Sequence, residues 1–126
     1  MRQYWQVMAT VDYRLARRAL LASLQRGSVA KHDVCDAHPE LLRAANGVGE
    51  RVGRPCPVCD ERDLRVVFYA YGKELKRENG RVRRRRDLAE LDARFDEYAC
   101  YVVEVCTGCS WNHLVRSYTA GRAHAV

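Results

Sequence analysis

The chain has 126 residues, of which 48% are apolar and 30% charged, and its formal net charge is +6. This length suits one domain or two small modules, and this balance excludes an intrinsically disordered chain. No apolar run approaches the roughly 20 residues that a membrane-spanning helix needs, so we expect a cytoplasmic protein with no membrane partner. Cysteines stay reduced there, which favours metal ligands over disulfides for the six cysteines.

Residues 1–52 are predicted to form a small helical module. Apolar residues recur at a helical spacing from Val11 to Gln25, and Gly27 supplies a stop signal. The stretch HPELLRAANG predicts a second helix that begins at Pro39. We interpret the module as a small helical bundle, although a helix-turn-helix gives the same pattern.

The segment between these two helices contains a further group of metal-ligand residue types. His32, Cys35 and His38 lie three residues apart. On a helix the outer two side chains diverge, so the three cannot meet one ion unless Pro39 breaks the helix. We interpret Cys35 as a small buried residue beside two surface histidines, and metal binding by this cluster stays open.

Residues 53–126 are predicted to form a second module, after the linker-like stretch GVGERVGRP. Three segments rich in β-branched and aromatic residues predict strands at Leu64–Tyr71, Tyr98–Val105 and Trp111–Tyr118. A helix over residues 87–97 is predicted between the first two strands, with Asp87 as its N-cap. The expected fold class is therefore α+β.

Two C-x-x-C pairs carry the clearest chemical signal. Cys56 and Cys59 form the first pair, and Cys106 and Cys109 form the second, with 46 residues between the two pairs. Two such pairs can present four thiolates tetrahedrally to one Zn²⁺ ion, and four thiolates leave no open position for catalysis. The sequence therefore predicts one structural zinc ion. We find no catalytic motif and expect no enzyme activity.

Two alternatives to this ligand set stay open. His113 stands four residues after Cys109 and is an alternative ligand if a turn brings the two side chains together. A redox role for the C-x-x-C pairs is the second alternative. In thioredoxin-like sites a βαβ unit surrounds the cysteine pair. No such unit is predicted around Cys56, so the redox role is disfavoured.

The CPVC and CTGC stretches resemble the paired knuckles of a zinc ribbon. That resemblance covers residues 54–119 and implies an antiparallel three-stranded sheet organised by zinc, with a basic segment and a helix inserted between the knuckles. The segments VCDAHPELLRAA, RFDEY, VVEVC and CSWNHLVRSY also resemble a short zinc-ribbon family of actinobacteria, a domain-of-unknown-function family. This wider resemblance implies no particular activity.

The positive charge is concentrated in one stretch, residues 73–86, which we call the basic segment. Residues 72–86 hold 8 basic and 2 acidic side chains, an excess equal to that of the whole chain. Asn79-Gly80 predicts a turn, so we expect a hairpin arm that projects from the sheet. The predicted contacts to nucleic acid are Lys73, Lys76, Arg77, Arg81, Arg83, Arg84, Arg85 and Arg86.

We therefore expect a non-enzymatic zinc protein that binds RNA or DNA in the transcription or translation machinery. Tyr69, Tyr71 and Trp111 are predicted to stack on bases. The alternative is an adaptor that docks on a larger machine such as RNA polymerase, the ribosome or a protease; a thiol-zinc redox switch is a third hypothesis. The sequence does not indicate an oligomeric state.

Overall fold

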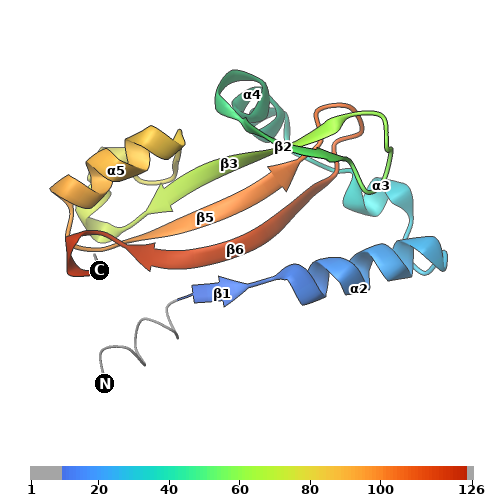
Figure 1. Ribbon diagram of the computed structural model, residues 1–126, viewed down its shortest axis with the longest axis horizontal. Coiled ribbons are helices and arrows are strands. Elements are labelled where there is room, and N and C mark those ends of the chain that lie inside the picture. Colours follow the sequence, from blue (N-terminus) through green and yellow to red (C-terminus); the bar gives the residue numbers. More distant parts are fainter. Residues whose placement is uncertain (1–9, 125–126) are drawn as a thin grey trace.

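The computed structural model describes residues 10–124 (Figure 1), and residues 1–9 and 125–126 lie outside this range. It contains six strands and four α-helices among these residues. In chain order the elements are β1 Thr10–Asp12, α2 Arg14–Gln25, α3 Lys31–Val34, α4 Pro39–Val48, β2 Glu50–Pro55, β3 Asp63–Tyr71, η1 Lys73–Glu78, β4 Arg81–Arg83, α5 Arg85–Arg94, β5 Tyr98–Val105, β6 Asn112–Ala120 and η2 Arg122–His124.

One antiparallel sheet contains all six strands, in the order β1-β6-β5-β3-β2, with β4 also paired to β3. The three predicted strands are confirmed as β3, β5 and β6, which run side by side in Figure 1. The expected sheet of three strands was too small, because β1, β2 and β4 extend it on both sides. The expected order of helices first and sheet afterwards is not confirmed either, since β1 precedes α2.

Helix α5 covers one face of the sheet. Its Leu88 and Leu91 are buried against Phe68 of β3 and Cys100 of β5, which point to the same side. Full burial of a leucine side chain contributes about 1.5–3 kcal/mol, so this contact holds the helix in place. Cys100 has no exposed surface, in agreement with its interpretation as a core residue.

Helix α4 covers part of the opposite face. Its Ala45 is fully buried against Val67 of β3 and Val105 of β5, whose side chains alternate with those that face α5. The small Ala45 side chain lets the helix backbone lie close to the sheet. Beyond α4, this face stays partly open around Tyr71 and Tyr101.

The end of the sheet near the C-x-x-C turns has a separate hydrophobic cluster. Buried Val34, Leu64 and Trp111 pack there with the cysteines, and leucines of α2 cover them. The predicted helix from Val11 is shorter than expected, because residues 10–12 pair with β6 as β1. Every residue of α2 keeps some exposure, and its attachment depends on the leucines that face this cluster.

The basic segment does not project as a hairpin arm. Residues 73–78 form the 3-10 helix η1, the Asn79-Gly80 turn reverses the chain, and β4 then pairs with β3. The last arginines belong to α5, which begins at Arg85 and not at Asp87. Asp87 contributes to the start of this helix differently from the prediction: its Oδ2 accepts a hydrogen bond from the Arg84 backbone N–H at 2.9 Å.

Gly121, at the end of β6, is expected to be intolerant of any side chain. Its φ is +114°, a conformation that residues with a Cβ rarely adopt, and a Cβ there would collide with the Asp96 carbonyl oxygen. We expect Gly121→Ala to destabilise the protein by about 1–3 kcal/mol, measured by urea unfolding. Gly47→Ala is the control. A Cβ at this helical position meets nothing within 4 Å, so this change should be neutral or stabilise by up to about 1 kcal/mol. Equal losses in the two variants would contradict this backbone geometry.

Among the described residues, no helix is long and apolar enough to span a bilayer.

Candidate metal centre

The first C-x-x-C pair lies in the turn between β2 and β3. The backbone N–H of Cys56 donates to the Arg62 carbonyl at 2.7 Å, and the N–H of Asp60 donates to the Cys56 carbonyl at 3.0 Å. Asp60 has a φ of +58°, in the left-handed region that asparagine and aspartate tolerate better than most residues. This tight turn directs both sulfur atoms to one side.

The second pair repeats this backbone pattern in the turn between β5 and β6. The N–H of Cys106 donates to the Trp111 carbonyl at 2.8 Å, and the N–H of Ser110 donates to the Cys106 carbonyl at 3.0 Å. Ser110 also has a positive φ, +71°. Because β3 and β5 are neighbours in the sheet, the two turns lie beside each other.

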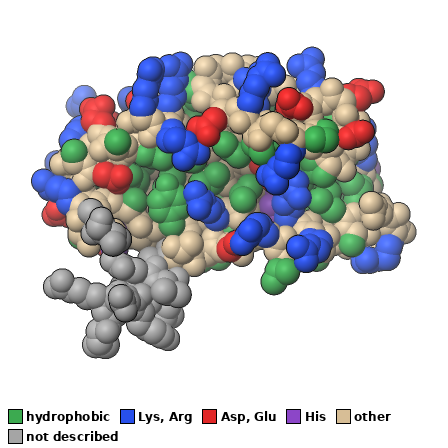
Figure 2. Space-filling model, viewed as in Figure 1, with side chains coloured by type: hydrophobic (Ala, Val, Ile, Leu, Met, Phe, Trp, Pro, Cys, Tyr) green, Lys and Arg blue, Asp and Glu red, His purple; other side chains and the backbone are tan. Residues whose placement is uncertain are grey.

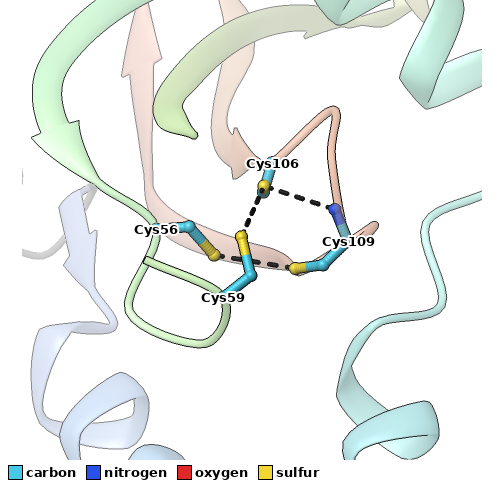
Figure 3. Close-up of side chains that lie close together, drawn as sticks. All are labelled: Cys56, Cys59, Cys106 and Cys109. Carbon is cyan, nitrogen blue, oxygen red and sulfur yellow. Dashed lines mark hydrogen bonds between the residues drawn. The ribbon is translucent and has the colours of Figure 1, made fainter. Parts of the chain in front are cut away.

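The four sulfur atoms converge on one point (Figure 3). The four Sγ atoms lie within 4.8 Å of one another, with 3.7 Å between those of Cys56 and Cys109 and 3.7 Å between those of Cys59 and Cys106. A tetrahedron of Zn–S bonds of about 2.3 Å has edges of about 3.8 Å. The donor set and its spacing therefore fit one zinc ion. We call these four residues the metal centre.

Backbone N–H groups support thiolates at the metal centre, where two of the four cysteines are buried. Cys56 and Cys106 are almost completely buried, while Cys59 and Cys109 are half-buried. The Cys56 sulfur accepts a hydrogen bond from Val58 N–H at 3.4 Å, and the Cys106 sulfur accepts bonds from Gly108 and Cys109 N–H at 3.3 and 3.5 Å. Such bonds offset part of the negative charge that four thiolates bring to one cation.

Burial also sets the protonation of the thiols when no metal is bound. It raises the pKa of Cys56 and that of Cys109 to about 12. Burial acts in the same direction on Cys59, but the backbone N–H of Glu61 and the neighbouring cysteine thiols outweigh it and lower the pKa of Cys59. Cys56 and Cys109 therefore carry protons at neutral pH in the metal-free protein, and a metal ion must displace them to bind.

The other predicted ligand residues lie elsewhere, with one exception. The His113 ring stacks on Trp111 at 5.8 Å, and His113 is not part of the four-sulfur cluster. His32 is exposed beside Asp33, and the His38 ring accepts a hydrogen bond from Glu40 N–H at the start of α4. Cys35 is the exception, because its sulfur lies 3.6 Å from that of Cys109. The sequence interpretation missed this contact, and no spacing rule links Cys35 to either pair.

The structure separates the three predicted stacking residues. Trp111 is fully buried, and its indole N–H donates to Glu104 at 2.8 Å, so its ring has no free face for a base. Tyr69 is half-buried and Tyr71 is exposed. Both lie on the α4 side of the sheet, in the part that α4 leaves uncovered. Tyr101, which pairs with Tyr69 across β3 and β5, joins them. The alternation of YACYVVEV could have indicated Tyr101, because alternate residues of a strand share a face.

The basic segment supplies side chains of two kinds. Arg83 is 13% exposed and contacts Glu78 at 3.3 Å. Arg85 pairs with Glu50 at 2.9 Å, and its guanidinium lies 5.1 Å from the centre of the Phe68 ring. The Arg83 contact is partly buried, whereas the Arg85–Glu50 pair is exposed and contributes little to stability. The remaining cations are exposed and make no ion pair within residues 10–124, namely Lys73, Lys76, Arg77, Arg81, Arg84 and Arg86.

Comparisons with known proteins place the chain among proteins without an assigned activity. A family model described as "Family of unknown function (DUF5318)" matches residues 1–126. Uncharacterised proteins of Mycobacterium bovis and Mycobacterium tuberculosis are each 45% identical to the chain over 113 residues, which cover 90% of this chain and 82% of each relative. No solved structure matches the chain.

Proposed function

The chain belongs to DUF5318, a family of unknown function, and we propose that it is a non-enzymatic, zinc-supported protein that binds single-stranded RNA or DNA. The observation that carries this proposal is a groove with three tyrosines on the open sheet face, beside the basic segment. In this proposal the metal centre is structural. It fixes the turns at one end of the strands that carry the tyrosines.

The groove is a shallow hollow of about 590 Å³. We call it the tyrosine groove, and it is lined by Leu41, Tyr69, Tyr71, Tyr101, Val103, Asn112 and Leu114. The rings of Tyr71 and Tyr101 meet edge to face with 5.2 Å between their centres, and Tyr71 is 41% exposed. Rigid, partly exposed rings on a sheet suit unpaired bases, because stacking contributes about 1–3 kcal/mol per base.

The basic segment borders the tyrosine groove along one edge of β3. Val82 of β4 pairs with Tyr69 and shares its face, whereas Arg81 pairs with Ala70 and lies on the opposite face. Gly80 lies against the Tyr71 ring, and Lys73 shares a neighbouring hollow with Tyr71. Lys73, an exposed cation, thus lies next to the exposed Tyr71 ring, and a single strand can use this combination for a phosphate and a base.

The wider surface has a matching charge. On the side of the sheet that Figure 2 shows, which carries α2 and α5, Lys and Arg side chains also surround a hydrophobic area and outnumber acidic side chains, so positive charge is not confined to the groove side. The chain's net charge of +6 attracts a polyanion such as nucleic acid more strongly than a partner protein with few acidic side chains. This complementarity is why we prefer nucleic acid to the adaptor role.

Binding is tested with labelled single-stranded RNA and DNA at two salt concentrations. Replacing Arg77, Arg81 and Arg84 by Ser should weaken binding at low salt and reduce the slope of log affinity against log salt by about 2–3. Replacing Arg14, Arg18 and Arg26 of α2 and its end by Ser removes equal charge away from the groove and is the control. Its slope should change less.

A second variant tests the rings. Tyr71→Leu should weaken binding by about 5-fold to 150-fold, equivalent to one lost stacking contact, without changing the salt slope. Fluorescence anisotropy measures both quantities. If wild-type protein binds neither RNA nor DNA at low salt, or if the two triple arginine variants behave alike, the proposed function is wrong.

A further inference from the structure

A fifth thiol lies against the metal centre. The Sγ of Cys35, just after α3, is 3.6 Å from the Sγ of Cys109. The two closest pairs within the metal centre itself are separated by 3.7 Å. Cys35 is therefore as close to one ligand sulfur as the ligands are to one another.

The chain on both sides of Cys35 is fixed to the metal centre. Val34 is buried in the cluster that includes the ligand cysteines. Two residues after Cys35, the Ala37 N–H donates to the Ser110 carbonyl at 3.0 Å. The Asn112 side-chain amide also donates to Asp36 Oδ1 at 2.9 Å. These contacts hold the Cys35 thiol at this position instead of leaving it there by chance.

Cys109 is a ligand with space to move. Cys56 and Cys106 are 1% and 0% exposed, whereas Cys109 is half-buried. It lines, together with Cys59, a hollow of about 480 Å³ that Lys31 and Arg62 border. The Cys109 side chain can therefore turn toward solvent without disturbing the buried core.

We propose that Cys35 is a reserve metal ligand that exchanges with Cys109. In the exchange the Cys35 thiol gives up its proton, the Cys109 sulfur takes a proton, one sulfur–metal bond forms and one breaks. Four thiolates hold the ion before and after, so no oxidant or other reactant is required. The exchange leaves Cys109 as a free thiol in the hollow beside Lys31 and Arg62 while the metal stays bound.

Cys100 shows how a purely structural cysteine differs. Cys100 is a completely buried residue of β5 that packs in the cluster under α5, and this cluster contains no other cysteine. Cys35 is half-buried and touches a ligand sulfur. A role limited to filling space would not require that contact.

The proposal is tested by metal affinity in four variants, with Zn²⁺ measured by competition against a chromophoric chelator and Co²⁺ by its thiolate absorption. Cys35→Ser and Cys109→Ser should each bind within about 10-fold of wild type, because four thiols remain. The double variant Cys35→Ser/Cys109→Ser should bind about 100-fold more weakly. Cys59→Ser is the matched control, since Cys59 is also the half-buried second cysteine of its pair, and it should be as weak as the double variant.

Either of two results would overturn the proposal. One is a metal affinity of Cys109→Ser as low as that of Cys59→Ser, and the other is a metal affinity of Cys109→Ser equal to that of the double variant. A measurement on the folded metal-loaded protein guards against misfolded variants. After limited alkylation with iodoacetamide, wild-type chains modified once at Cys109 should keep one metal ion by native mass spectrometry. In Cys35→Ser protein the same modification should accompany metal loss. Equal metal loss in both proteins would also refute the reserve-ligand role.

Discussion

Replacing Cys106 by Ser is expected to abolish tight zinc binding and to unfold the end of the sheet that carries the metal centre. Cys106 has no exposed surface and accepts two backbone N–H bonds at its sulfur. Structural zinc sites bind with apparent free energies of about 10–16 kcal/mol, and much of that energy is coupled to folding. Losing one buried thiolate should therefore cost more than the stability of a typical small domain can tolerate.

Cys100→Ser is the matched control, because Cys100 is equally buried but lies outside the metal centre. A buried hydroxyl costs about 1–3 kcal/mol without a partner, so a mild loss is expected. The measurements are zinc content per chain and thermal unfolding by circular dichroism, with and without a chelator. The chelator should lower the melting temperature of wild type and of Cys100→Ser, but not that of Cys106→Ser. If both variants keep zinc equally, the ligand assignment is wrong.

Removing the Arg17 guanidinium is expected to destabilise the protein by about 3 kcal/mol. Arg17 of α2 contacts the Glu104 carboxylate at 2.7 and 3.0 Å, and the Trp111 indole N–H donates to the same carboxylate at 2.8 Å. Glu104 is only 4% exposed. Arg17→Leu would leave a buried carboxylate with one neutral partner, and breaking a buried pair costs about 3–5 kcal/mol; the partial exposure of Arg17 places the loss at the lower end.

The double variant Arg17→Leu/Glu104→Leu separates this cause from lost packing. It should recover much of the stability, since no uncompensated charge remains. Arg14→Leu is the control, because the Arg14 pair with Asp12 is exposed and its loss should leave the unfolding midpoint unchanged. The measurement is urea unfolding of the zinc-loaded protein. An Arg17→Leu midpoint equal to that of Arg14→Leu would show that the buried network contributes no stability.

The sequence predicted the elements with strong periodicity and missed the short ones. β3, β5 and β6 are long and rich in β-branched residues, and their positions were correct to within two residues. β1 has three residues and includes Asp12, so it shows no measurable alternation. β2 contains Gly53, in a left-handed conformation, and a register shift before Pro55. Glycine and proline therefore suggested a linker where a bulged strand lies.

The same difference holds for the candidate site: the sequence predicted its local motifs and missed its contacts between distant residues. The two C-x-x-C pairs could be recognised because each ligand turn is local and its spacing is fixed by backbone geometry. Cys35 and the Arg17–Glu104 contact could not, because they join residues 74 and 87 positions apart and depend on how the helices pack. The basic segment was identified by composition, but composition did not reveal that β4 would pair with β3.

The pairing of β1 with β6 has a consequence for how the molecule is made. Thr10 lies opposite Tyr118, so the first strand finds its partner only when nearly the whole described chain has left the ribosome. Cys106 and Cys109 also emerge late, and until then Cys56 and Cys59 offer half of a site. Contacts between such distant residues slow folding, so sheet closure and metal capture should be late and coupled steps of biosynthesis. The cell's supply of free zinc at that moment would then decide how much of the newly made protein matures.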